Sequence, residues 1–130
     1  MPCTHCGGDL LSLPVPADLR EYLPDGTEGV SLCRDCLAMA PVDGPPADVP
    51  DLTKLDDAFP SNPDAAVPMA LLVGLLDSLA LHRAEITALL ERVERAGTDP
   101  LLVVDRLAER YGADAHVDLA ARRRQLEQLL

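Results

Sequence analysis

The sequence predicts an α+β protein, in which a small N-terminal domain of short antiparallel strands precedes a C-terminal bundle of three helices. Two Cys-x-x-Cys pairs lie within residues 1–43. Seven of the twelve prolines fall between Pro41 and Pro68 and separate this segment from the rest. The chain contains 24 Leu and 17 Ala among 130 residues, and both are strong helix formers. We therefore divide the chain into a cysteine-containing domain (1–43), a proline-rich strap (44–66) and a helical bundle (67–130).

The N-terminal domain has strand-forming segments on either side of the cysteine pairs. Residues 10–15 leave the first pair, residues 29–32 enter the second, and residues 37–42 leave it. Residues 17–23 favour a short helical segment, and Pro24-Asp25-Gly26 is typical of a turn. These segments predict a small antiparallel sheet that ends at the cysteines.

The strap is expected to be an extended linker rather than a packed element, because its prolines fix φ and remove backbone donors. Its apolar residues Val49, Leu52, Leu55 and Phe59 are able to lie along a neighbouring surface.

Three helices are expected after the strap. The first spans residues 64–96 and ends at Gly97, because Leu and Ile recur at three- and four-residue spacing. The second begins at Thr98-Asp99-Pro100, a cap residue followed by proline, and ends at Gly112. The third spans residues 116–130. Short connections between them favour antiparallel packing.

The segment 69–81 is apolar on nearly all sides, and such a helix must be covered by other atoms. An intramolecular core meets this need, and so does a homodimer through residues 69–93. The segment is too short to span a bilayer, so no membrane association is expected. The N-terminus lacks the pattern of a signal peptide, and a cytoplasmic location is expected.

The four cysteines indicate a metal site. Cys3 and Cys6 form one pair, Cys33 and Cys36 form the other, and 26 residues separate the pairs. Two such turns supply four thiolates, the tetrahedral set that one Zn²⁺ ion accepts. Two disulfides, a thioredoxin-like dithiol or a rubredoxin-like iron site are the alternatives. Two disulfides would need an oxidising environment, which nothing in the sequence indicates, and a thioredoxin-like dithiol would need a surrounding βαβ pattern, which is absent. A rubredoxin-like iron site uses the same four cysteine ligands as zinc, so the ligands do not distinguish the two metals.

The two turns differ in the residues that follow them. Gly7 and Gly8 follow the first pair and permit the positive φ that turns backbone N–H groups toward the sulfurs. Leu37 follows the second pair, so we expect a less regular backbone there.

This arrangement of knuckles and strands over residues 1–43 resembles the zinc-ribbon class, which has rubredoxin-like knuckles. The whole chain more loosely resembles small haloarchaeal zinc-ribbon proteins of unknown function. The resemblance implies one structural Zn²⁺ held by Cys3, Cys6, Cys33 and Cys36. Because four thiolates leave no coordination position for water, such a site is structural rather than hydrolytic, and we expect no enzyme activity.

The histidines are not expected to add chemistry. His5 is expected to be an exposed knuckle residue, His82 a solvated helical residue, and His116 a residue near a helix cap. None has a partner arrangement that supports a nucleophilic triad.

The formal net charge is −11, with one lysine, ten arginines and 22 acidic residues. This balance resembles that of cytoplasmic proteins from salt-loving archaea, where salt screens self-repulsion. An acidic protein of a GC-rich mesophile is the alternative. Because phosphate backbones require Lys and Arg, nucleic acid is not the favoured partner. The only basic run, Arg122–Arg124, is expected to be the polar side of the last helix.

These observations favour a non-enzymatic, zinc-containing adaptor that acts through protein–protein contacts. A transcription or translation regulator that associates with nucleic acid is the alternative, and a rubredoxin-like electron carrier is the second alternative.

Overall fold

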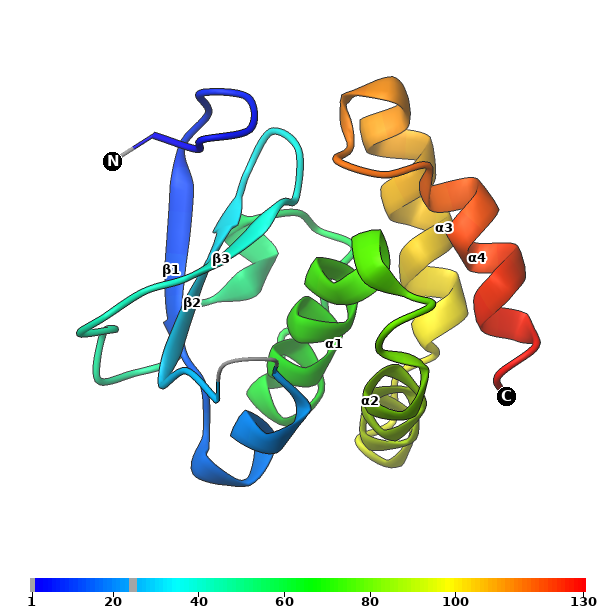
Figure 1. The fold of residues 1–130 in the computed structure, drawn as a ribbon, viewed down its shortest axis with the longest axis horizontal. Coiled ribbons are helices and arrows are strands. Elements are labelled where there is room, and N and C mark those ends of the chain that lie inside the picture. Colours follow the sequence, from blue (N-terminus) through cyan, green and yellow to red (C-terminus); the bar gives the residue numbers. More distant parts are fainter. Residues whose placement is uncertain (1, 24–25) are drawn as a thin grey trace.

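A computed structural model describes residues 2–23 and 26–130. The sheet contains strands β1 (Leu10–Pro14), β2 (Gly29–Cys33) and β3 (Met39–Pro41). The α-helices of the described part are α1 (Pro63–Leu75), α2 (Arg83–Arg95), α3 (Pro100–Tyr111) and α4 (Leu119–Glu127). The sheet lies on one side of α1, and the other α-helices lie on the opposite side (Figure 1). The expected α+β class is thus confirmed.

The sheet is antiparallel in the order β1-β2-β3, so β2 is the central strand. Leu10 of β1 pairs with Cys33, and Ser31 of β2 pairs with Ala40. Strands β1 and β3 fall within the segments expected from sequence, and β2 extends one residue beyond its expected segment, to Cys33. The short 3-10 helix η1 (Ala17–Tyr22) occupies the expected helical segment, and residues 24 and 25 of the expected turn lie outside the described residues.

The expectation of an unpacked linker is wrong, because the strap packs against the body of the protein through its apolar residues. Leu52, Leu55 and Phe59 are buried in the same hydrophobic core as α1. The Tyr111 hydroxyl of α3 donates to the Leu55 carbonyl oxygen at 3.4 Å. Arg110 of α3 pairs with the strap carboxylates of residues 56 and 57 at 3.6 and 3.7 Å. The apolar side chains of the strap are therefore buried in the core, and its polar edge is held to α3.

Helix α1 forms the centre of the molecule. Every residue from Ala65 to Leu75 is buried. A homodimer through residues 69–93 is one way to cover this apolar segment. Over the part of the segment that lies in α1, other parts of the same chain already cover it. Sheet, strap and helices contribute to one continuous core.

The expected single helix over residues 64–96 is wrong, because the chain breaks into α1 and α2. The 3-10 helix η3 (Leu76–Ser78) ends α1, and a turn leads to Arg83. A straight helix of that length would extend about 50 Å and leave most of α1 uncovered. Breaking the helix lets the apolar face of α2, with Ile86 and Leu89, pack back on α1. The described residues consequently form four α-helices rather than the expected three.

Helix α3 begins at Pro100, as the sequence predicts, whereas α4 begins at Leu119, three residues after the expected start at residue 116. The Asp99 carboxylate caps α3 by accepting from the N–H groups of Leu101 and Leu102 at 3.0 and 3.3 Å. The Asp118 carboxylate caps α4 by accepting from Ala121 N–H at 3.0 Å. Within residues 2–23 and 26–130, no helix combines the length and apolarity that crossing a membrane requires.

Helix α1 approaches the sheet closely at Gly74. An ideal Cβ atom placed there would lie 2.5 Å from Met39 Sδ and 2.6 Å from Met39 Cβ. Alanine normally stabilises a helix by about 1 kcal/mol over glycine. Because the Met39 Cβ cannot rotate away, we expect the substitution Gly74→Ala to lower the free energy of unfolding by about 1–3 kcal/mol instead.

Denaturant unfolding of Gly74→Ala, Met39→Gly and the double variant tests this packing. The double variant should lose less stability than the sum of the two single variants, because no Met39 side chain remains to clash. An increase in stability on Gly74→Ala alone would show that the close approach does not constrain this position.

Candidate metal centre

The structure brings the four cysteines together. The two loops that carry them, residues 3–6 and 33–36, lie at the same end of the sheet (Figure 1). Their Sγ atoms all lie within 4.8 Å of one another. The Sγ–Sγ distance is 3.8 Å between Cys3 and Cys36 and 3.4 Å between Cys6 and Cys33. All four cysteines are in the described part of the chain and each is a free thiol, so the alternative of two disulfides is not what the structure shows.

The two knuckles share one backbone pattern. Gly7 N–H donates to the Cys3 carbonyl oxygen at 2.8 Å, and Leu37 N–H donates to the Cys33 carbonyl oxygen at 2.9 Å. Each knuckle also aims a backbone N–H at its first sulfur. These contacts are 3.3 Å for His5 N–H on Cys3, and 3.3 Å for the residue 35 N–H on Cys33. Such donors offset negative charge on thiolates.

The expectation of a less regular second knuckle is wrong. Leu37 adopts φ +67°, close to the φ of +79° at the equivalent Gly7. A left-handed conformation costs a non-glycine residue about 1–2 kcal/mol. The Leu37 side chain is completely buried in the core shared with α1, and this burial offsets the cost. The leucine therefore joins the second knuckle to the body of the protein.

The second glycine of the first knuckle has a different role from the one expected. Gly8 is not among the residues with positive φ. A Cβ atom at this position would overlap the Asp35 carboxylate of the second knuckle. Gly8 thus permits the close approach of the two knuckles, which convergence of the sulfurs requires.

Burial differs among the four thiols. Cys3, Cys33 and Cys36 are buried, whereas Cys6 is exposed. Burial is the main factor that raises the pKa of the Cys36 thiol, and the neighbouring cysteines raise it further. Burial also acts to raise the pKa of Cys3, but hydrogen bonds from backbone N–H groups of the first knuckle outweigh it and lower this pKa to about 7. A metal ion at this site would compete with a proton for the Cys36 sulfur.

His116 is a residue of the site that the sequence reasoning missed. Its backbone N–H donates to the Cys36 carbonyl oxygen at 2.7 Å, and its ring Nδ1 lies 3.1 Å from the same oxygen. Because a carbonyl oxygen only accepts, Nδ1 carries the hydrogen in this contact. Burial is the main factor that lowers the pKa of His116, which favours the neutral ring. The connection between α3 and α4 is thereby fixed to the second knuckle.

The remaining sequence candidates lie elsewhere. His5 is exposed, as expected, and contributes only its backbone N–H to the site. His82 is half-buried at the start of α2. The Arg122–Arg124 run is divided, because Arg123 pairs with Asp105 at 2.8 Å and with Glu127.

The sulfur geometry fits a tetrahedral ion. Zinc–sulfur bonds of about 2.3 Å place the sulfurs of an ideal tetrahedron about 3.8 Å apart. The two Sγ–Sγ distances of 3.8 and 3.4 Å are close to that value. The cluster can therefore hold one metal ion, with all four ligand positions supplied by the chain.

The chain belongs to the DUF6276 family, described as a family of unknown function, whose model matches residues 2–130. The match begins before the first knuckle and continues through α4, so it covers the sheet, the strap and the helices together. No curated protein and no solved structure matches the chain.

Leu37 and Gly7 provide a matched pair for testing how the metal centre is attached. We expect Leu37→Gly to lower the free energy of unfolding by about 2–4 kcal/mol, because the lost burial exceeds the relieved backbone strain. An ideal Cβ at Gly7 meets no atom within 4 Å. Gly7→Ala should therefore cost only about 1 kcal/mol of left-handed strain.

Thermal and denaturant unfolding of the metal-loaded variants measure both effects. If Leu37→Gly were neutral or stabilising, the leucine would not be the anchor between the knuckle and the core.

Proposed function

We propose that the chain is a non-enzymatic adaptor whose N-terminal knuckles fold around one structural zinc ion and present a rigid surface to another protein. The observation that carries the proposal is the closed set of four cysteine sulfurs within 4.8 Å. Four thiolates fill a tetrahedral zinc site, so no coordination position remains for a substrate or for an activated water. Binding of zinc would instead contribute to folding.

The knuckles offer an exposed surface for a partner. We define the tip surface as the exposed residues Pro2, Thr4, His5, Gly7, Arg34 and Asp35. Its backbone is fixed by the hydrogen bonds within each knuckle, and Leu37 and His116 fix the second knuckle to the core. A surface held in this way loses little conformational entropy on binding. It also carries both charge signs, which is unlike the basic surface that nucleic acid requires.

Metal content is the first test. We expect about one zinc per chain in protein purified without added metal, because the donor set is complete. Cys36→Ser should reduce this content to less than about a tenth and lower the melting temperature, because the site then lacks a buried ligand. His5→Ala is the matched control and should keep its zinc, because only the backbone N–H of His5 serves the site.

Elemental analysis and visible absorption check this prediction together. Iron in place of zinc, with thiolate-to-iron absorption, would support the rubredoxin-like electron carrier and contradict the structural-zinc proposal. Zinc loss from His5→Ala equal to that from Cys36→Ser would contradict the assignment of ligands.

Partner capture is the second test. We immobilise the zinc-loaded chain and expose it to nuclease-treated native lysate at high salt, and we identify retained proteins by mass spectrometry. Arg34→Glu should reduce retention of the specific partner about tenfold, because it reverses a charge at the tip surface. Arg106→Glu is the matched control, since Arg34 and Arg106 are both exposed and neither forms an ion pair among the described residues.

The outcomes are distinct. Retention that Arg34→Glu abolishes and Arg106→Glu preserves supports the adaptor. Equal loss in both variants would indicate a diffuse charge effect and contradict the tip surface. Retention that nuclease removes would favour the alternative of a nucleic-acid-associated regulator.

A further inference from the structure

A second candidate site lies at the opposite side of α1 from the sheet. We define the corner pocket as the cavity of about 320 Å³ between the turn that joins α1 to α2 and helix α4. Its polar lining consists of Asp77, Ser78, Arg83, Arg122, Gln125 and Gln128. Leu79 and Leu81 of the turn add an apolar side, and Leu81 is 81% exposed. A volume of this size is at the lower end of the range for small-molecule pockets.

The arginines of the corner pocket lack acidic partners. Acidic residues outnumber Lys and Arg by 22 to 11 in this chain. Arginines 92, 95, 110 and 123 form ion pairs, whereas the other six arginines form none with any described residue. Arg83 and Arg122 are two of these six, and they line the same cavity together with Asp77. Two guanidinium groups in one cavity repel each other, so a shared anion would stabilise both.

The Arg122 side chain is fixed by one hydrogen bond, and its Nε–H has no partner among the described residues. Its Nη1 donates to Gln125 Oε1 at 2.8 Å, which fixes the orientation of the guanidinium. Its Nε–H has no exposed surface and no hydrogen-bond partner among the described residues. Because this edge is shielded from water, the charge is less solvated than that of a surface arginine, and an adjacent anion interacts with it more strongly.

Helix α2 adds to the positive potential of the pocket. Arg83 is the first residue of this 13-residue helix, and its N-cap residue His82 makes no side-chain cap hydrogen bond. The N-terminal end of a helix carries a partial positive charge. This partial charge adds to the positive potential of the two arginines, but it would not make an anion-binding site without them.

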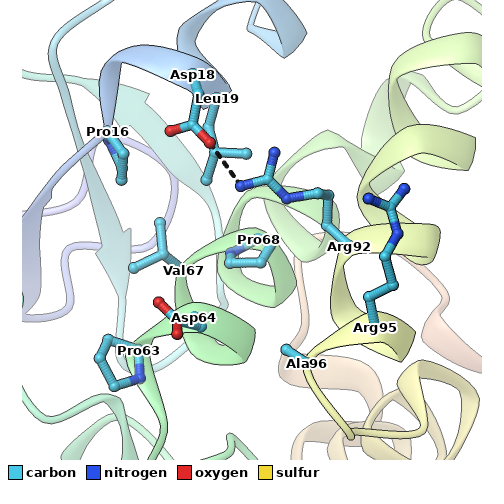
Figure 2. Close-up of a pocket in the computed structure, with 10 residues that line it drawn as sticks. All are labelled: Pro16, Asp18, Leu19, Pro63, Asp64, Val67, Pro68, Arg92, Arg95 and Ala96. Carbon is cyan, nitrogen blue, oxygen red and sulfur yellow. Dashed lines mark hydrogen bonds and ion pairs between the residues drawn. The ribbon is translucent and has the colours of Figure 1, made fainter.

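A larger cavity elsewhere provides the contrast. About 380 Å³ in volume, it lies between η1, the start of α1 and the end of α2 (Figure 2). Here Arg92 donates to Asp18 at 2.6 Å, and Asp64 and Arg95 also line the space. Its two arginines face two carboxylates, so the cavity has no surplus of positive charge.

We propose that the corner pocket binds a small molecule through an oxyanion group, phosphate or carboxylate, held between Arg83 and Arg122. The planar guanidinium fork matches both groups. Ser78 and the amides of Gln125 and Gln128 supply neutral polar groups around it, and the turn supplies apolar contact for the remainder of the ligand. This pocket is independent of the metal centre, so its failure would leave the adaptor proposal intact.

The test is a titration of the zinc-loaded full chain with inorganic phosphate and, separately, with acetate at fixed ionic strength. Nuclear magnetic resonance follows the backbone N–H signals and the arginine Nε–H signals. We expect saturable shifts confined to residues around the corner pocket, including the Nε–H of Arg122. Arg83→Gln and Arg122→Gln should each weaken binding about tenfold or more, because a charge-assisted hydrogen bond is lost.

Arg95→Gln is the matched control. It removes the same charge from the balanced cavity and should change affinity less than about twofold. Arg122→Lys keeps the charge without the fork, so it tests the geometry if Arg122→Gln fails to fold. Tighter binding of phosphate would assign a phosphate ligand, and tighter binding of acetate would assign a carboxylate ligand. Absence of saturable shifts with both probes, or equal weakening by Arg95→Gln, would overturn the proposal.

Discussion

Helix α1 has no polar face, and the need to cover it on all sides determines the rest of the fold. Its residues from Ala65 to Leu75 are all buried. The sheet and the strap cover one side, and the helices that follow cover the other. Removing either cover would expose a large apolar surface, at a cost of about 25 cal/mol per Å². The cysteine segment is therefore part of one core rather than an appendage to a separate helical domain.

The metal centre is coupled to this core at a single short segment. Cys36 supplies a sulfur to the cluster, its carbonyl oxygen accepts from His116, and the next residue, Leu37, is buried against the body. A shift of the second knuckle would move all three contacts together. Loss of a bound metal ion would thus destabilise the α3–α4 connection, about 80 residues further along the chain, as well as the sheet. This coupling is the physical reason to regard the ion as part of the stability of the whole chain.

Local sequence signals predicted the parts of the structure that local chemistry determines. The spacing of the Cys pairs predicted which four sulfurs would meet, and Asp99-Pro100 predicted the start of α3. The break between α1 and α2 was not predicted, because Leu76 and Leu79 continue the helical spacing through it. The break serves coverage of α1, which is a property of the folded chain. Such tertiary demands override local propensity.

The features of the site that the sequence did not predict also depend on tertiary structure. Nothing in the residue type of Leu37 indicates a left-handed backbone, and only its buried environment makes that conformation affordable. His116 is separated from Cys36 by 80 positions, and no local pattern connects them. The corner pocket likewise combines Arg83 with Arg122 from two helices that are far apart in sequence. In the sequence, Arg122 was one member of a basic run, whereas the fold gives each member of that run a different environment.

The two ends of the molecule are suited to different tasks. A cluster whose four sulfurs satisfy one ion has no remaining position for a ligand, so recognition there can involve only the outer surface of the knuckles. The corner pocket has the opposite character, because Arg83 and Arg122 line it without an ion-pair partner among the described residues. Of its two arginines, Arg83 is exposed to solvent, whereas the Nε–H of Arg122 is shielded from water and has no hydrogen-bond partner among the described residues, so an external anion would mainly compensate the charge of Arg122. We therefore propose small-molecule recognition at the helical end and contact with another protein at the knuckles.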